Sequence, residues 1–292
     1  MKDFRYAAPA SIAEAAKLLA GANGSARILA GGTDILVQLR EGMKDADLVV
    51  DVKRIPELAE LTYSPQKGLR LGASVPCYGI YEHPELAKAY GALVDAARIV
   101  GGWQIQSRAS VGGNLCNSSP AADTIPPLIA HHAYADIVGP GGHRNVAIEN
   151  FCTGPGKNVL QPGELVAAIV FPPVLPHSGS AYERFIPRNE MDIAVVGAAS
   201  KVQLAKTLDK IEFARVSVGA VAPTPKFCQE ASEWLAGKPL SEETYAQAGE
   251  LAKKVASPIT DMRGTIEYRV HLVGVLVKRT LTAAVARARQ NA

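Results

Sequence analysis

The chain has 292 residues, of which 48% are hydrophobic and 20% charged, a composition typical of a folded globular protein. Its 31 basic and 28 acidic residues leave a formal net charge of only +3, and 6% of the residues are aromatic, so we expect no nucleic-acid partner. The best candidate for a membrane span, Leu272 to Val277, is far too short, so we expect no transmembrane segment, and the N-terminus shows no signal-peptide pattern.

The cysteines are far apart in the sequence and form no Cys-x-x-Cys pair. Their spacing therefore predicts neither a zinc site nor an iron–sulfur cluster in this chain. Four reduced thiols are typical of a cytoplasmic protein, and this is the location that we expect. The cysteines are Cys77, Cys116, Cys152 and Cys228.

The N-terminal part of the chain predicts a small parallel β-α-β unit. Ser11 and Glu14 form a capping box for a first amphipathic helix, which Gly21 ends. The elements expected after this helix are a strand over residues 26–30, a diglycine turn, a helix from Ile35 and a strand over residues 48–52.

The middle part of the chain mixes short strands with helices, which indicates an α+β arrangement. Helices are expected over residues 83–100 and 126–132, and strand-like runs cover 68–72, 104–111, 134–138 and 165–171. The proline-rich segment at residues 172–176 is the best domain boundary. We therefore expect one domain over residues 1–175, with subdomains of about 1–55 and 56–175, and a second domain over residues 176–292.

The C-terminal part predicts an antiparallel sheet that carries helices. Strands are expected over residues 194–204 and 211–221, joined across Leu208-Asp209-Lys210, and a helix over residues 240–256. A long terminal helix is indicated by an apolar seam at Ile266, Val270, Val273, Val277 and Leu281.

Two diglycine turns carry most of the functional information in this sequence. They are Ala30-Gly31-Gly32-Thr33-Asp34 and Ser110-Val111-Gly112-Gly113-Asn114, and each follows a strand-like run. Glycine can take positive φ and lets backbone N–H groups approach phosphate oxygens, while a following helix start favours negative charge. Two such loops together predict a site for one diphosphate.

An acidic residue after the first turn raises the alternative of a dinucleotide-binding Rossmann unit. Asp51 lies twenty residues after Gly31, where an acid would bind a ribose hydroxyl. However, the turn lacks the third glycine of that fingerprint, and strands and helices stop alternating after one unit. Asp51 is better explained as a residue that ends a strand or stands in a turn.

Over nearly its whole length, the chain resembles the FAD-binding medium subunit of the molybdenum hydroxylases, which include xanthine, carbon monoxide and aldehyde dehydrogenases. Both diglycine turns match the family's diphosphate-binding motifs, and Ser119-Pro120-Ala121-Ala122-Asp123 matches the stretch that follows them. The family's later Asp-Ile-Ala segment, which places a side chain against the flavin ring, corresponds to Asp192-Ile193-Ala194. The resemblance implies a PCMH-type FAD-binding fold of two α/β subdomains plus a C-terminal antiparallel sheet with helices.

The resemblance also implies a set of FAD-binding residues, and it implies no catalytic or metal-binding residue in this chain. The implied cofactor-binding residues are Leu29, Ala30, Gly31, Gly32, Thr33, Asp34, Ile35, Val100, Ser110, Val111, Gly112, Gly113, Asn114, Asp123 and Ile193.

The chemistry of several residues leaves alternatives open. Thr33, Ser110 and Asn114 offer side-chain donors, and Asp123 offers acceptors for ribityl hydroxyls but also suits a helix N-cap. Asp34 either contacts the cofactor or begins the helix at Ile35, and Ile193 also suits an ordinary core position. Arg108 suits a phosphate contact or a solvated surface. The pair His131-His132 points in two directions on a helix, which does not favour a metal site.

The implied function is electron transfer. A large partner subunit would carry the molybdenum cofactor, and a small one would carry two 2Fe-2S clusters, with this chain passing electrons from FAD to a final acceptor. A dimer of heterotrimers is the expected assembly. Because the four cysteines are scattered, the chain departs from relatives with an extra iron–sulfur insertion, and we expect it to bind FAD alone.

Two other functions are compatible with the sequence. One is a free-standing FAD-dependent oxidase or reductase, which would need its own acid or base, and none is legible. The other is a flavin-free scaffolding subunit. Flavin absorbance and turnover without partners separate the three hypotheses.

Overall fold

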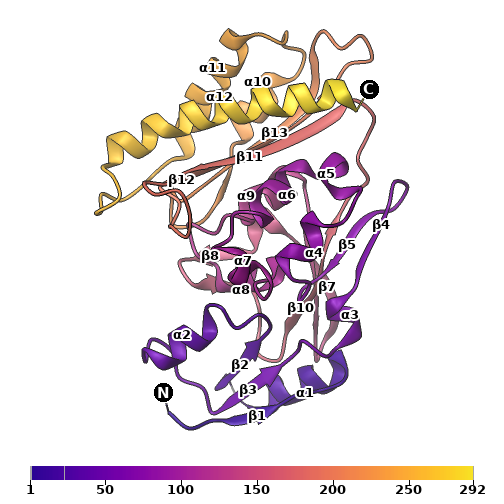
Figure 1. Ribbon diagram of the computed structural model, residues 1–292, viewed down its shortest axis with the longest axis vertical. Coiled ribbons are helices and arrows are strands. Elements are labelled where there is room, and N and C mark those ends of the chain that lie inside the picture. The colour runs from indigo at the N-terminus through magenta and orange to yellow at the C-terminus, as the bar shows by residue number, and fades with distance from the viewer. Residues whose placement is uncertain (1, 23, 292) are drawn as a thin grey trace.

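The structure is a computed structural model that describes residues 2–22 and 24–291. Figure 1 shows an elongated molecule in which an N-terminal unit, a central unit and a C-terminal unit follow one another along the long axis. Each unit contains its own sheet. The mixed architecture, with antiparallel sheets and packed helices, confirms the expected α+β class.

The N-terminal unit is the predicted parallel β-α-β unit with one additional edge strand. β3 lies between β1 and β2 and pairs in parallel with both. Ser11 caps α1 by accepting a hydrogen bond from the Glu14 amide at 3.2 Å, as the capping box predicts. The Glu14 carboxylate bonds the Ala10 amide instead of the Ser11 amide. The elements are β1 (Arg5–Ala7), α1 (Ile12–Gly21), β2 (Ala26–Leu29), α2 (Ile35–Arg40) and β3 (Leu48–Asp51).

The central unit is built on an antiparallel sheet in the order β4, β5, β10, β6 and β7. Tyr90, Phe151 and Phe171 are fully buried in the core beside it. The strands are β4 (Leu61–Ser64), β5 (Gly68–Gly72), β6 (Tyr134–Gly139), β7 (Gly142–Ala147) and β10 (Leu165–Phe171), with a small hairpin of β8 (Cys152–Gly154) and β9 (Lys157–Asn158). The helices are α3 (Pro56–Ala59), α4 (Cys77–Tyr81), α5 (Leu86–Ala89), α6 (Gly91–Ala97), α7 (Trp103–Gln106), α8 (Val111–Asn117), α9 (Ile125–Ala130) and the 3-10 turn η1 (Ile148–Asn150).

The prediction of one helix over residues 83–100 is wrong in one respect, because the helix breaks at Tyr90 into α5 and α6. The Tyr90 backbone leaves the helical region, its ring is fully buried, and its hydroxyl donates to the Pro172 carbonyl at 2.9 Å. A Cβ on Gly91 would lie 2.9 Å from the Ser180 carbonyl oxygen. Packing against two distant segments therefore overrides local helix propensity.

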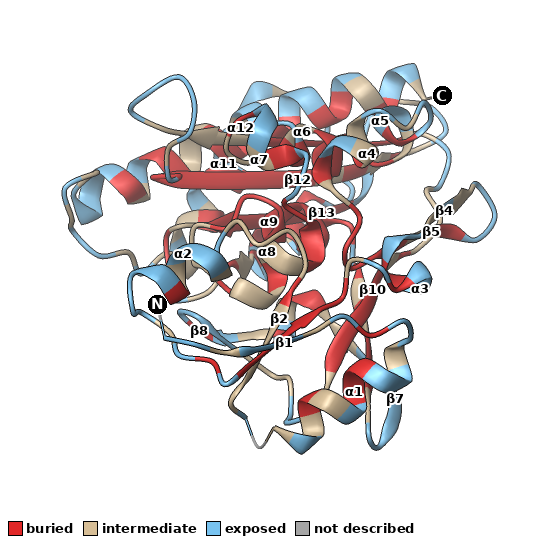
Figure 2. Cartoon of the chain, turned by 60° about the horizontal axis from the view of Figure 1, so that its bottom comes forward, coloured by how far each residue is buried: buried red, intermediate tan, exposed pale blue. Residues whose placement is uncertain are grey.

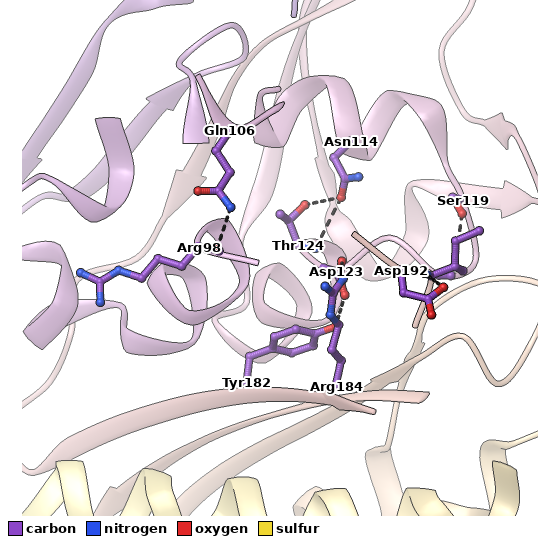
Figure 3. Close-up of polar contacts among 11 residues, drawn as sticks. Arg98, Gln106, Asn114, Ser119, Asp123, Thr124, Tyr182, Arg184 and Asp192 are labelled. Carbon is purple, nitrogen blue, oxygen red and sulfur yellow. Dashed lines mark hydrogen bonds and ion pairs between the residues drawn. The ribbon is translucent and has the colours of Figure 1, made fainter. Parts of the chain in front are cut away.

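The prediction of a strand-like run over residues 104–111 is also wrong, because the first part of this segment is helix α7 (Trp103–Gln106). The amide of Gln106 bonds the Gly102 carbonyl, and the Gln106 side chain, 3% exposed, bridges Tyr81 and the Arg98 carbonyl (Figure 3). Polar and apolar residues alternate in this segment because Gln106 is buried with its own hydrogen bonds, and not because the segment is a strand with two different faces. The second diglycine turn consequently follows a helix and an extended segment, not a strand.

The C-terminal unit is an antiparallel sheet in the order β11, β12, β13 and β14, with a long helix along it. β12 and β13 confirm the two predicted strands, whereas β11 was not expected from its small residues. Small residues are required where β11 packs against α12, because a Cβ on Gly179 would overlap the Ala284 carbonyl of α12. The elements are β11 (Ser178–Phe185), β12 (Val196–Leu204), β13 (Ile211–Gly219), β14 (Lys226–Phe227), α10 (Gln229–Leu235), α11 (Glu242–Ala252), the 3-10 turn η2 (Lys253–Val255) and α12 (Ile266–Gln290).

The C-terminal sheet has an apolar core on one side and the central unit on the other. α10, α11 and α12 cover the first side, while α6 and α9 contact the second. Figure 2 shows β10, β12 and β13 as buried elements in the interior and α2 as an exposed one. In the described part of the chain, no helix is both long enough and apolar enough to cross a membrane.

Candidate functional site

A cavity of roughly 480 Å³ lies between the N-terminal and central units, and both diglycine loops line it. The loop from residues 30–34 forms one wall, the start of α8 forms a second, and residues 158 and 160–166 form a third. Its volume is within the usual range for a small-molecule site. The two motifs, eighty residues apart in the sequence, thus meet in space.

Most of the sequence-predicted site residues line this cavity, and four do not. Leu29 and Val111 are buried in the core, while Asp123 and Ile193 lie toward the C-terminal unit. The predicted residues that line the cavity are Ala30, Gly31, Gly32, Thr33, Asp34, Ile35, Val100, Ser110, Gly112, Gly113 and Asn114.

The first diglycine loop offers backbone amides to the cavity. Gly32 has a φ of +84°, a conformation that glycine adopts without strain. Among the described residues, none accepts a hydrogen bond from the amides of Gly31, Gly32 or Thr33. Three successive free amides at a helix start are a favourable anion-binding arrangement.

The two loops touch each other at a single backbone contact. A Cβ on Gly31 would overlap the carbonyl oxygen of Arg108, two residues before Ser110. Gly31 is therefore required by the approach of the second loop. The Arg108 side chain itself is exposed and lies outside the cavity lining, as expected for a solvated arginine.

The second diglycine loop begins α8, and its two glycines have different causes. Ser110 caps the helix by accepting from the Gly113 amide at 3.0 Å. A Cβ on Gly112 would lie 2.6 Å from the Ala73 Cα, so packing excludes a side chain there. At Gly113 a Cβ would lie 3.1 Å from the Ser110 Oγ, a tight contact, and beyond its own helix it would meet no other atom within 4 Å. Gly113 lies in the cavity lining.

Asp34 and Asn114 have defined roles at the cavity wall. Asp34 stands at the N-cap position of α2 but makes no capping hydrogen bond, and burial raises the pKa of its carboxyl group, opposed by Lys44. The Asn114 Oδ1 accepts from the Thr124 hydroxyl at 2.6 Å and from the Thr124 amide at 3.4 Å. Asn114 is thereby tied to the segment that leads into α9.

Asp123 is buried in a polar cluster with two side chains of β11 (Figure 3). Its carboxylate accepts from the Tyr182 hydroxyl at 2.8 Å and from the Arg184 guanidinium at 2.5 Å. Burial raises the pKa of Asp123 to about 6, although Arg184 and Tyr182 lower it. Asp123 does not cap a helix, since Thr124 occupies the N-cap position of α9.

Several polar residues of the cavity wall escaped the sequence-based reasoning, among them Ser74, Arg27 and Lys44. The Ser74 hydroxyl is buried, and it has no hydrogen-bond partner among the described residues. Arg27 and Lys44 add positive charge, and burial together with Arg27 lowers the pKa of Lys44. None of the three belongs to a recognisable motif, because the fold alone brings them to the cavity.

Two residues that the sequence raised as alternatives have structural roles. Asp51 is 6% exposed, and its carboxylate accepts from the Tyr6 hydroxyl at 2.6 Å and from the Lys53 ammonium at 2.7 Å. His131 is packed between the rings of Tyr90 and Phe171, and burial holds its pKa well below the usual value. Within residues 2–22 and 24–291, no group of three or more His, Cys, Asp or Glu side chains is placed to hold a metal ion.

Two family models match this chain and together cover most of it. Residues 2–174 match a model described as "FAD binding domain in molybdopterin dehydrogenase". Residues 180–284 match a model described as "CO dehydrogenase flavoprotein C-terminal domain".

Curated relatives and solved structures match over the full length. The putative xanthine dehydrogenase FAD-binding subunit of Escherichia coli K12 is 35% identical, covering 99% of this chain and 98% of the relative. A carbon monoxide dehydrogenase structure from Hydrogenophaga pseudoflava has a TM-score of 0.93 at 29% identity and covers 98% of both chains. Quinoline 2-oxidoreductase from Pseudomonas putida 86 has a TM-score of 0.89 at 28% identity and covers 99% of both chains.

Proposed function

Because this chain belongs to the family of FAD-binding medium subunits of the molybdenum hydroxylases, we propose that the cavity between its two diglycine loops holds the FAD diphosphate. The family membership makes the chain the FAD-binding subunit of an oxidoreductase of the xanthine and carbon monoxide dehydrogenase type. The residue assignments below are proposals that rest on the cavity geometry.

The observation that carries the proposal is that both diglycine loops line one cavity. Contacts with distant backbone explain the missing side chains of Gly31 and Gly112, whereas a side chain at Gly113 would meet only the Ser110 hydroxyl beyond its own helix. A ligand that must approach the backbone of α8 adds a second reason for glycine at this position. The Ser74 hydroxyl, buried in the same wall without a protein partner, also fits a polar ligand.

The hydrogen-bond donors of the cavity wall suit an anionic group. The unpartnered amides of the first loop favour one diphosphate, and Arg27 and Lys44 supply cations on the same wall. The wall also carries the carboxylates of Asp34 and Glu164, of which Glu164 is paired with Arg144. Ser110 holds the start of α8 in place through the Gly113 amide. When bound, FAD supplies the redox chemistry, while the chain binds and orients it.

We assign two residues outside the cavity lining to the flavin end of the cofactor. Asp123 would accept hydrogen bonds from ribityl hydroxyls, since a carboxylate has acceptor capacity beyond its bonds to Tyr182 and Arg184. Ile193, 51% exposed on the segment between β11 and β12, would pack against the flavin ring. Val100 and Ile35, at the cavity wall, would complete the apolar contacts.

The partners that we propose follow from family membership. A large subunit would carry the molybdenum cofactor, and a small subunit would carry two 2Fe-2S clusters. One copy of each would form a heterotrimer with this chain, and two heterotrimers would form a dimer. The relative from Hydrogenophaga pseudoflava is named a medium chain, which supports a multi-subunit enzyme. All four cysteines are free thiols, which supports a cytoplasmic location. We propose domains over residues 1–175 and 176–292, supported by two separate apolar cores.

The test replaces Gly113 by valine in the full chain. We expect Gly113→Val to lose FAD on gel filtration, because the added methyl groups fill the space left for the ligand. The matched control is Gly21→Val, since Gly21 also lies in a helix, a Cβ there would have no heavy atom within 4 Å, and the residue is outside the cavity lining. Circular dichroism checks that both variants fold.

A folded Gly113→Val protein that retains stoichiometric FAD would overturn the cavity assignment. Turnover of an organic substrate by the isolated wild-type chain would favour the free-standing flavoenzyme instead.

A further inference from the structure

A network of polar contacts links the C-terminal sheet to the cavity wall (Figure 3). At one end, Tyr182 and Arg184 of β11 bind both carboxylate oxygens of Asp123. The next residue, Thr124, is fully buried and donates to the Oδ1 of Asn114. At the other end, Asn114 lines the cavity.

Both neighbouring units hold the segment between α8 and α9. It has no regular structure, and Ser118 at its start has a φ of 52°. The central unit binds this start, where the Gly156 amide donates to the Ser118 carbonyl at 3.0 Å. The C-terminal unit binds the part nearer α9, through the Ala220 amide, which donates to the Pro120 carbonyl at 2.7 Å, and through the contacts of Asp123.

Burying the ion pair between Asp123 and Arg184 costs free energy, because both charges lose their contact with water. Packing alone would not require charged side chains at these positions. The two side chains are 11% and 7% exposed. Buried ion pairs are often no more stabilising than apolar residues of similar volume, so the pair is better explained by geometry than by stability. A Cβ on Gly197 of β12 would lie 2.5 Å from the Tyr182 hydroxyl, so the sheet leaves room for this phenol.

We propose that Arg184 and Tyr182 are positioning residues for the flavin site: they fix Asp123, and through Thr124 they fix Asn114 at the cavity wall. The inference rests on the proposed function, since it assumes that FAD occupies the cavity. It makes the C-terminal domain part of the FAD-binding machinery, although β11 does not line the cavity.

The experiment measures the FAD dissociation constant of the full-length chain by flavin fluorescence. We expect Arg184→Gln to weaken binding about 10- to 100-fold, and Tyr182→Phe, which removes one hydroxyl, about 3- to 10-fold. Arg184→Lys should restore part of the affinity, because it keeps the charge but not the planar geometry.

The matched control is Arg287→Gln. Arg287 joins α12 to Asp95 of α6 and to the Ser180 carbonyl of β11, so it also ties the two domains together. Asp95 also accepts from the Tyr182 amide at 3.1 Å, but this bond is made by the backbone of β11 and not by the Tyr182 hydroxyl that binds Asp123. Loss of the Arg287 ion pair should leave the FAD affinity within about twofold of the wild type.

The pH dependence of FAD binding gives a readout that a purely structural role would not move. Arg184 and Tyr182 are the groups that lower the pKa of Asp123, and both come from β11. Without Arg184 the carboxylate takes up a proton at higher pH, so as the pH is lowered the affinity of Arg184→Gln should begin to fall at a higher pH than that of the wild type, whose Asp123 has a pKa of about 6. Asp123→Asn should remove this dependence.

The possible outcomes separate the two hypotheses. A folded Arg184→Gln variant with wild-type affinity and pH profile overturns the inference, as does an equal loss of affinity in Arg287→Gln. If Arg184→Gln does not fold, Tyr182→Phe decides alone. If the folded wild-type chain binds no FAD, the proposed function fails first.

Discussion

The Ser74 hydroxyl is a test of the cavity at the scale of one residue. A buried hydroxyl without a partner gains a hydrogen bond when a suitable ligand enters. We expect Ser74→Ala to weaken FAD binding about 3- to 30-fold, with little change in the free energy of unfolding of the FAD-free protein. Flavin titration and chemical denaturation measure the two quantities.

The control for Ser74 is Ser178→Ala, because Ser178 Oγ is also buried and unpartnered among the described residues but lies outside the cavity lining. Equal FAD affinity of Ser74→Ala and the wild type would remove Ser74 from the site.

Lys201 predicts a pH dependence of stability. It lies on β12 beside Arg215 of β13, and burial together with Arg215 lowers the pKa of Lys201 to about 8. The unfolded chain then binds more protons than the folded one between about pH 8 and about pH 10.5, so this group destabilises the fold fully below pH 8 and ceases to do so as pH rises toward 10.5. We expect Lys201→Met to raise the free energy of unfolding by about 1–3 kcal/mol at neutral pH, and less at high pH.

Urea denaturation at two pH values measures this effect, with Lys206→Met, an exposed lysine just beyond the end of β12, as the control. A gain from Lys201→Met that is equal at neutral and high pH would contradict the assignment.

Single residues differ in how far the sequence reveals them. The diglycine pattern is visible in the sequence, but only Gly32 answers a local need, its positive φ. Gly31 and Gly112 are required by contacts with the backbone of Arg108 and of Ala73, which the sequence does not reveal. Ser74, Arg27 and Lys44 were not predictable, because each reaches the cavity through the fold. Asp123 was picked out through the family motif, but its bonds to Tyr182 and Arg184 join residues about sixty positions apart.

At the scale of elements, the contact of α12 with β11 makes Gly179 sensitive to substitution. A Cβ there would overlap the Ala284 carbonyl and lie 3.0 Å from the Ala288 Cα. We expect Gly179→Val to lower the free energy of unfolding by about 2–4 kcal/mol, because α12 must move off the sheet. Chemical denaturation measures the loss.

Gly154→Val is the control, since Gly154 lies in β8 and the nearest atom to its Cβ position is 3.9 Å away. Comparable losses in the two variants would show that α12 yields easily and that the contact is not tight.

The elements that the sequence predicted well are those whose capping residues and apolar residues lie within the element itself. α1 has its cap and apolar stripe, and β12 and β13 have long apolar runs. The sequence did not predict β11, because its contact with α12 requires small residues, and small residues in a sequence are typical of a linker. The break at Tyr90 was missed because it depends on Pro172, eighty-two residues away.

At the scale of the whole molecule, the N-terminal and central units bring the two diglycine loops to one cavity. The cavity that both loops line is the one assigned to FAD, and no metal-binding cluster is present in the described residues. We expect the isolated chain to bind FAD but to turn over no organic substrate. Co-expression with the molybdenum and iron–sulfur subunits should give a complex in which substrate bleaches the flavin absorbance.

Absorbance spectroscopy of the single chain and of the complex checks this expectation. Turnover by the single chain at about 1 per second or faster, a common enzyme rate, would contradict it.

The backbone contact between Gly31 and Arg108 also limits how such chains can be recombined. Every residue at position 108 has a backbone carbonyl, so the close approach depends on glycine at position 31 and not on the side chain at 108. A chimera that takes residues 1–55 from another relative should therefore keep the fit of the two segments where that relative also has glycine at the position of Gly31, and should lose it where a side chain stands there.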